Sequence, residues 1–236
     1  MEESELKNAQ ADYVILSIAE LITGAPFGVF DFDSLCQVHD RLFGDIFDCA
    51  GKIRLINIEK EEAALGGLSV EYTDVFDVKE EAEAVLADMN EYQWEKAAFE
   101  DIVTNFADFM ARLWKVHPFR EGNTRTVVLY CVMFIEAQGI YIESGLFQEH
   151  IEYTRRALAA ASAVFKNVGD LRRPEYLYRI VRDGLEQGKR TADNAVERII
   201  RAGFPAAKEQ IQRIIYWDRR ESTLHGEEEI RKFLKV

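Results

Sequence analysis

The chain is organised around the stretch His117-Pro-Phe-Arg-Glu-Gly-Asn-Thr-Arg-Thr126, which is followed at once by the apolar run Val127-Val-Leu-Tyr-Cys-Val-Met-Phe-Ile135. The segment from Asn123 to Gln138 is apolar on nearly every side and ends at Gly139. Its valines and aromatic residues would also suit a strand, and periodicity alone does not decide between the two. The length of the segment and its terminal glycine favour a helix, which we predict to be the buried centre of the core.

Apolar residues at helical spacing continue on both sides of this segment. They predict a mainly α protein with one main domain, residues 1–188, and a C-terminal helical extension, residues 189–236. The polar stretch Gln187-Gly-Lys-Arg190 is the predicted linker between the two parts. The predicted helices span residues 9–22, 33–43, 77–92, 99–116, 147–168, 175–185, 193–202, 205–217 and 227–234.

One part of the chain has the pattern of strands. Residues 52–59 and 68–73 are short and rich in Ile, Leu, Val and Tyr, and the second segment alternates apolar and polar side chains. This pattern predicts a two-stranded β-hairpin, with the charged segment 60–67 as its long connection. An isolated hairpin is only marginally stable, and its open edge could pair with a peptide from another protein. A surface ornament without a partner is the alternative.

Composition limits the classes of partner. The 29 Lys and Arg residues against 42 Asp and Glu residues give a net charge of −13, so we expect no nucleic acid partner. The longest apolar run is about half the length of a membrane span, and we expect no membrane partner. Three widely spaced cysteines and an acidic N-terminus predict a cytoplasmic protein, with export by a route that leaves no signal still open.

The polar loop before the central helix has the groups that phosphate chemistry requires. The first backbone N–H groups of the helix would point back towards His117, which places an anion site beside a base. Gly122 lets the backbone approach phosphate oxygens, Asn123 offers an amide donor, and Arg125 offers a guanidinium fork. These groups predict transfer of a phosphate-containing group to a hydroxyl.

Two further residues bear on this interpretation. Glu121 is the obvious oxygen ligand for Mg²⁺, which in phosphate sites commonly uses one protein carboxylate. His117, with an ordinary pKa of about 6.5, can accept a hydroxyl proton near neutral pH. His39 is expected to be a hydrogen-bonded structural residue rather than a second base. The alternative for the whole loop is a polar helix junction with a capping asparagine.

The spacing of these groups resembles the signature of the Fic (filamentation induced by cAMP) family, His-x-Phe-x-Asp/Glu-Gly-Asn-Gly-Arg-x-x-Arg. The matching positions are His117, Phe119, Glu121, Gly122, Asn123 and Arg125. The resemblance extends from about Tyr13 to Gly188. It includes the segment from Leu35 to Arg54, which is similar to the family's His-x-x-Leu-Phe and Trp-Ala-Gly-x-x-Arg patterns, with Cys49 where tryptophan is usual.

The resemblance implies a Fic-type helical bundle with a β-hairpin flap at about residues 52–73. It implies a Mg²⁺-dependent nucleotidyltransferase, a protein adenylyltransferase that moves AMP from ATP to a Tyr, Ser or Thr hydroxyl of a target protein, or of itself. In such an enzyme His117 is the base and Glu121 holds Mg²⁺. The nucleotide would contact Gly122, Asn123, Thr124 and Arg125, and the target would lie along the flap residues Ile56, Asn57, Ile58 and Lys60.

Two positions depart from the signature. Thr124 stands where the second glycine is usual, and Val128 stands where a second arginine, which grips the γ-phosphate in Fic enzymes, is usual. The change at Thr124 is similar to the Doc branch, which has lysine there and transfers the γ-phosphate itself. A Doc-like kinase, or a weakly catalytic module that binds a nucleotide or a partner, are therefore the alternatives.

Many Fic proteins are restrained by a helix with the pattern Ser/Thr-x-x-x-Glu-Gly/Asn. The nearest sequences here are around Ser222, Thr223, His225 and Glu227, and none is a complete copy. Because Val128 offers no arginine for an inhibitory glutamate, we expect weak autoinhibition of this kind or none. The identity of the target is left open, and so is a homo-oligomer.

Overall fold

The computed structural model describes residue 10, residues 13–21 and residues 28–202, and the side chains of α8 only as far as residue 192. Residues 13–21 are helical. The helices that follow are α2 (Phe32–Phe43), α3 (Val78–Glu91), α4 (Phe99–Val116), α5 (Asn123–Ala137), α6 (Ser144–Glu149), α7 (Ile151–Ala161) and α8 (Glu175–Ala202), with 3-10 turns η1 (Ala63–Leu65) and η2 (Trp94–Lys96) and strands β1 (Val164–Phe165) and β2 (Gly169–Asp170). The prediction of a mainly α protein is confirmed.

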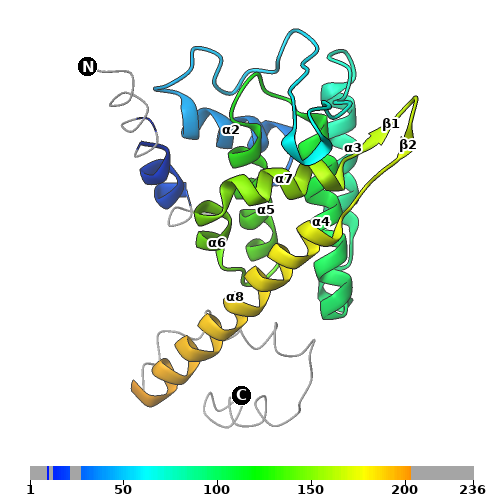
Figure 1. Ribbon diagram of the computed structural model, residues 1–236. Helices are drawn as coiled ribbons and strands as arrows, with labels where there is room; N and C mark the ends of the chain where they lie inside the picture. The colour runs from blue at the N-terminus through cyan, green and yellow to red at the C-terminus, as the bar shows by residue number, and fades with distance from the viewer. Residues whose placement is uncertain (1–9, 11–12, 22–27, 203–236) are drawn as a thin grey trace.

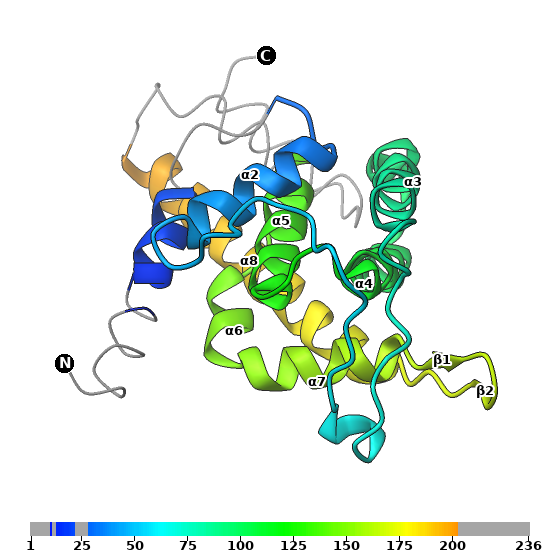
Figure 2. The same ribbon diagram turned by 90° about the horizontal axis from the view of Figure 1, so that it is seen from above.

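Helix α5 is the centre of the core, as predicted. Every residue of α5 from Thr126 to Ile135 is buried. Figures 1 and 2 show α5 between α2 on one side and α4 on the other, and both helices pack against it. A helix that is apolar all round is stable only when its neighbours cover it on all sides. The start of α5, where the polar loop lies, is therefore held rigidly by the core.

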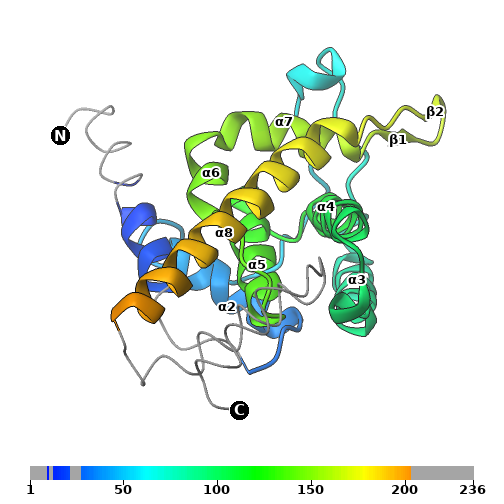
Figure 3. The same ribbon diagram turned by 90° about the horizontal axis from the view of Figure 1, so that it is seen from below.

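Helix α4 has the bounds that its apolar pattern predicts. Its buried face includes Phe106, Met110 and Trp114, and α3 packs against it from outside. The helix ends at Val116, two residues before Pro118, because proline cannot continue a helix. Figure 3 shows α8 crossing the bundle diagonally, where it packs against both α4 and α7.

The predicted linker at residues 187–190 is wrong, because α8 runs through it without interruption. The glycine in this stretch serves close packing. A Cβ atom on Gly188 would lie 2.6 Å from the backbone oxygen of Tyr141, and one on Gly184 would lie 3.1 Å from Ile142. The backbone N–H of Glu143 also donates to Gly184 O at 2.9 Å. The division of the chain at residue 188 stays a prediction.

The single helix predicted over residues 147–168 is also wrong. The chain forms α6 and α7 with a break at His150, whose φ of −114° and ψ of 37° are not helical. It then forms the antiparallel hairpin of β1 and β2, in which Phe165 pairs with Gly169. Val164 and Phe165 favour a strand, and Gly169 adopts a φ of 95°. These preferences outweigh the helical spacing at the end of the segment.

The hairpin predicted at residues 52–73 is a loop rather than two regular strands. Its two legs share one antiparallel bridge, between Glu61 and Ser69, and its tip holds the 3-10 turn η1. The regular two-stranded hairpin of the described residues is β1 and β2. We keep the name flap for residues 52–73.

The legs of the flap separate because their polar groups bond elsewhere. Arg54 lies between them, and its guanidinium donates hydrogen bonds to Ile56 O and Thr73 O. The backbone N–H of Thr73 donates to Lys115 O at the end of α4, at 3.4 Å. A buried arginine side chain thus replaces the ladder of strand hydrogen bonds.

The predicted helices at residues 205–217 and 227–234 lie outside the described residues, and the one at 193–202 is the end of α8. Within the part of the chain that the structure describes, no helix is both long enough and apolar enough to cross a membrane.

Candidate active site

His117 is placed at the end of α4 in a left-handed backbone conformation, with a φ of 52°. Its side chain is only 3% exposed. The Nδ1 atom lies 3.3 Å from Trp114 O, which can only accept a hydrogen bond, so Nδ1 carries the proton. The Nε2 atom is buried and has no hydrogen-bond partner among the described residues. A buried nitrogen with a free lone pair can accept a hydrogen bond from a hydroxyl that enters the pocket.

The surroundings keep this imidazole neutral. Burial, joined by the positive charges of Lys60, Arg54 and Arg155, lowers the pKa of His117 to about 3, while the hydrogen bond to Trp114 O opposes the shift. Both burial and nearby cations disfavour the charged form of a histidine. His117 is therefore neutral throughout the physiological pH range.

His39 holds the loop in place, as predicted for a structural histidine. The backbone N–H of Gly51 donates to its Nδ1 at 2.8 Å. Its Nε2 therefore carries the proton and donates to Glu121 O at 3.0 Å. The ring also stacks on Phe119, with 3.8 Å between the ring centroids. Because both nitrogens are used, His39 is a support for the loop and not a base.

Arg54 ties the loop to the flap. It is 3% exposed, and its Nε donates to His117 O at 2.8 Å while its other nitrogens donate to backbone oxygens of both legs of the flap. Sequence reasoning assigned no role to Arg54. Its place at the end of the Ala50-Gly-Lys-Ile-Arg54 segment, which resembles the Fic pattern, could have indicated a role.

Gly122 is required by both conformation and space. Its φ is 78°, and a Cβ atom would lie 2.4 Å from Cε2 of Phe43. Non-glycine residues seldom adopt this φ, and no side chain fits in this space. Gly122 directly precedes α5, so it allows the chain to turn sharply into the helix.

The structure corrects the role predicted for the Asn123 amide. Its Oδ1 accepts from Phe119 N at 2.9 Å, and its Nδ2 donates to Phe119 O at 2.7 Å. The side chain is 2% exposed. It closes the loop between Phe119 and α5 instead of pointing towards a ligand, although its backbone N–H still belongs to the start of the helix.

A pocket of about 160 Å³ opens in front of His117. It is lined by Lys60, Glu62, Trp114, His117, Glu121, Gly122, Thr124, Arg125, Ile151, Glu152 and Arg155. The pocket thus joins the start of α5, the flap and α7. Trp114 donates its indole N–H to Thr124 Oγ1 at 3.0 Å, which leaves the hydroxyl hydrogen of Thr124 available as a donor.

The two positions that depart from the Fic signature have different environments. Thr124 lines the pocket, whereas Val128 is 5% exposed within the core cluster. Arg125 is exposed at the start of α5 and lines the pocket. Of the predicted nucleotide residues, the pocket therefore brings together Gly122, Thr124 and Arg125.

Glu121 lies at the edge of the pocket with its side chain 56% exposed. Its Oε2 is 3.0 Å from Lys60 Nζ of the flap. Within the described residues, no group of three or more His, Cys, Asp and Glu side chains could hold a metal ion. A single exposed carboxylate such as Glu121 could hold a hard cation that takes its other oxygen ligands from a substrate and from water, as Mg²⁺ commonly does.

The predicted target-binding residues of the flap do not all face the pocket in front of His117. Lys60 faces the pocket, as its ion pair with Glu121 requires. Asn57 is a structural residue: its Oδ1 accepts from Val75 N at 2.8 Å, and its Nδ2 donates to Asp74 at 3.0 Å. Ile56 is 64% exposed. Asn57 and Ile58 line a separate groove of about 600 Å³ beside the flap.

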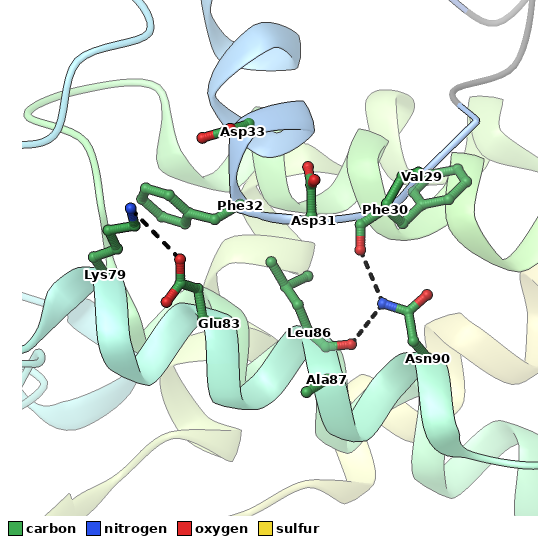
Figure 4. A pocket seen from close by; sticks show the side chains of 10 residues that line it. All are labelled: Val29, Phe30, Asp31, Phe32, Asp33, Lys79, Glu83, Leu86, Ala87 and Asn90. Carbon is green, nitrogen blue, oxygen red and sulfur yellow. Dashed lines mark hydrogen bonds and ion pairs between the residues drawn. The ribbon is translucent and has the colours of Figure 1, made fainter.

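A further cavity, of about 320 Å³, lies between the start of α2 and α3. Figure 4 shows its polar groups bonded to one another: Asn90 donates to the backbone oxygens of Phe30 and Leu86, and Lys79 pairs with Glu83. Asp31, also in its wall, caps α2 by accepting from Ser34 N. These interactions hold the start of α2 against α3. The residues that line this cavity include no histidine, unlike those of the pocket in front of His117.

The predicted regulatory residues Ser222, Thr223, His225 and Glu227 lie outside the described residues. The expectation of weak or absent autoinhibition stays a prediction.

The fold and the site together define a helical bundle in which a buried, neutral histidine faces a pocket at the start of the central helix. Residues 29–135 match the model of the Fic/DOC family.

Two curated relatives carry the name protein adenylyltransferase. VbhT of Bartonella schoenbuchensis is 27% identical over 150 residues, which cover 60% of this chain and 28% of VbhT. A protein adenylyltransferase of Bartonella henselae is 25% identical over 187 residues, which cover 72% of this chain and 33% of the relative. The chain thus spans a third or less of the length of these relatives.

The fold is shared with solved Fic domains. The structure of BepC from Bartonella tribocorum with bound AMPPNP has a TM-score of 0.60 and 19% identity, and the match covers 78% of this chain and 87% of that chain. At this identity the similarity establishes the fold alone.

Proposed function

We propose that this protein is an adenylyltransferase that moves AMP from ATP to a hydroxyl side chain of a target protein. The observation that carries the proposal is the buried Nε2 atom of a neutral His117, which has no hydrogen-bond partner in the described part of the chain and faces the pocket at the start of α5. The names of the curated relatives support the same activity. BepC, which has this fold, binds an ATP analogue, and this supports a nucleotide as substrate.

The chemistry assigns one step to His117. Its Nε2 accepts the proton of the target hydroxyl, and the hydroxyl oxygen attacks the α-phosphorus of ATP. The bond from the α-phosphorus to the bridging oxygen breaks, and pyrophosphate leaves. The negative phosphates would raise the pKa of His117, because they oppose the effect of the nearby cations, so the bound nucleotide makes the base stronger.

The phosphates would bind at the start of α5. The first hydrogen bond within the helix runs from Thr126 N to Gly122 O at 3.1 Å, so the backbone N–H groups of Asn123, Thr124 and Arg125 are free of helical partners. Free N–H groups and the helix dipole favour an anion there, and the Arg125 guanidinium adds a full positive charge. Preorganised donors of this kind provide the main stabilisation of charge in phosphoryl transfer.

Mg²⁺, held by Glu121, would neutralise part of the phosphate charge when it is bound. The exposed carboxylate at the pocket edge fits this role. Lys60, which now pairs with Glu121, would then be free to contact the nucleotide.

The target would lie along the flap. Ile58 and Glu59 have no backbone N–H hydrogen bond to another described residue, so this leg presents an open edge. An extended peptide can bind such an edge as an added strand. Its side chain hydroxyl would then be directed at His117, which Arg54 joins to the flap.

Transfer of labelled phosphate tests the proposal. The protein is incubated with Mg²⁺, a lysate as a source of targets, and ATP labelled at either the α- or the γ-phosphate. Label on protein from α-labelled ATP alone is expected. Label from γ-labelled ATP would instead indicate a Doc-like kinase, and no label from either, with His117→Ala indistinguishable from wild type, would indicate a binding module.

The substitution Glu121→Gln tests the metal role. Magnesium is expected to strengthen ATP binding to the wild type but to have little effect on the variant, as measured by titration with Mg²⁺ and with EDTA. The melting temperature should change little, because an exposed ion pair such as that with Lys60 contributes only about 0–1 kcal/mol. An equal effect of Mg²⁺ on both proteins would remove Glu121 from this role.

A further inference from the structure

Three cations line the pocket, and each comes from a different element. Arg125 belongs to α5, Lys60 to the flap and Arg155 to α7. Arg125 is the only Lys or Arg in α5. A bound nucleoside triphosphate carries several negative charges, and Lys60 of the flap and Arg155 of α7 are the other lysine and arginine side chains of the pocket lining that can offset them. Lys60 is paired with the exposed Glu121, and Arg155 is paired with Glu62.

The pair of Arg155 and Glu62 is unequal. The Arg155 side chain is 38% exposed, while that of Glu62 is 3% exposed. Glu62 Oε1 lies 3.1 Å from an Arg155 nitrogen and accepts a hydrogen bond from the Tyr72 hydroxyl at 3.3 Å. The ring of Tyr72 lies 4.0 Å from that of His117, centroid to centroid. Glu62 is thus a buried carboxylate beside the base, and its cation remains accessible from the pocket.

A guanidinium binds a carboxylate and a phosphate with the same planar fork, so a phosphate can take the place of Glu62 on Arg155. The Tyr72 hydroxyl remains a donor to Glu62, but a buried carboxylate that loses its cation is unfavourable, so the exchange takes up part of the binding free energy of the phosphate. The carboxylate also repels an incoming anion, so Glu62 opposes nucleotide binding until it gives up Arg155.

We infer that Arg155 binds the β- or γ-phosphate of a nucleoside triphosphate, in exchange for Glu62, and so makes the pocket selective for triphosphates over monophosphates. This inference rests on the proposed function for the identity of the nucleotide. It predicts opposite effects for the two partners of one ion pair: Arg155 favours nucleotide binding, and Glu62 opposes it.

The opposite effects of Arg155 and Glu62 on nucleotide binding distinguish this inference from a purely structural role of their ion pair. If Arg155 and Glu62 only fastened the flap to α7, loss of either partner would change nucleotide binding in the same direction. If Arg155 binds phosphate, loss of Arg155 weakens ATP binding and loss of the Glu62 charge strengthens it.

The test is a calorimetric titration of the full chain with Mg²⁺ and ATP, and separately with AMP. Arg155→Ala is expected to weaken ATP binding by about tenfold or more, the effect of losing one charge-assisted hydrogen bond, and to change AMP binding by less than about twofold. Arg155→Lys should show a smaller loss, since it keeps the charge without the fork. Glu62→Gln should bind ATP more tightly than the wild type. The neighbour Arg156 provides the control, Arg156→Ala, which should bind both nucleotides as the wild type does.

Two outcomes overturn the inference: equal weakening of ATP and AMP binding in the Arg155 variants, or weaker ATP binding in Glu62→Gln. The titration does not require turnover. If no AMP is transferred to protein while Arg155→Ala still loses its selectivity for ATP, the inference stands and the proposed function fails. If AMP is transferred and the selectivity does not change, the reverse holds.

Discussion

The substitution His117→Asn is expected to reduce AMP transfer by about 10²- to 10⁴-fold, the usual contribution of a positioned general base. An amide cannot accept the hydroxyl proton in place of Nε2. Asparagine is preferable to alanine here because it tolerates the left-handed conformation of position 117, where φ is 52°. The measurement is the initial rate of label transfer at saturating ATP.

The control is that the variant stays folded and binds ATP. Circular dichroism should show the same helical content as in the wild type. An activity within a few fold of the wild type, in a folded variant, would show that His117 is not the base.

The same variant reports on the pKa of His117 through stability. Because burial lowers the folded-state pKa from 6.5 to about 3, protonation favours the unfolded chain. This contribution to stability is present above pH 6.5 and is lost as the pH falls towards 3. His39, whose pKa is also lowered by burial, acts in the same direction. The free energy of unfolding of His117→Asn should therefore decrease less between pH 7 and pH 5 than that of the wild type.

The substitution Gly122→Ala should destabilise the protein by about 2–5 kcal/mol and abolish transfer. The left-handed conformation costs a non-glycine residue about 1–2 kcal/mol, and forcing extra volume into a packed site costs about 1–3 kcal/mol. The clash arises with Phe43, which is 1% exposed and cannot move away. Because Gly122 leads into α5, any relief would displace the start of that helix. Urea unfolding and label transfer measure the two effects.

Gly66→Ala is the matched control, since Gly66 has a φ of 66° but no atom of the described residues lies within 4 Å of the position that a Cβ would take. It should cost only the conformational part, about 1–2 kcal/mol. Equal destabilisation by the two substitutions would show that Phe43 does not restrict position 122.

The strongest local signals in the sequence predicted the core. The apolar face of residues 99–116, ended by Pro118, and the apolar segment before Gly139 predicted α4 and α5 nearly to the residue. The same reasoning failed where contacts between residues far apart in the sequence determine the local structure. Gly188 looks like part of a linker, but it allows α8 to approach Tyr141 closely.

By itself, the sequence determined the central helix and the set of polar groups in front of it, because both depend on residues adjacent in the chain. Only the tertiary structure decided how these groups are used. It joins the Asn123 amide to Phe119, buries His117 near cations of the flap and of α7, and places Glu62 against Arg155. The residues of this last pair are 93 positions apart, and burial and charge at such a separation arise only when the chain is packed.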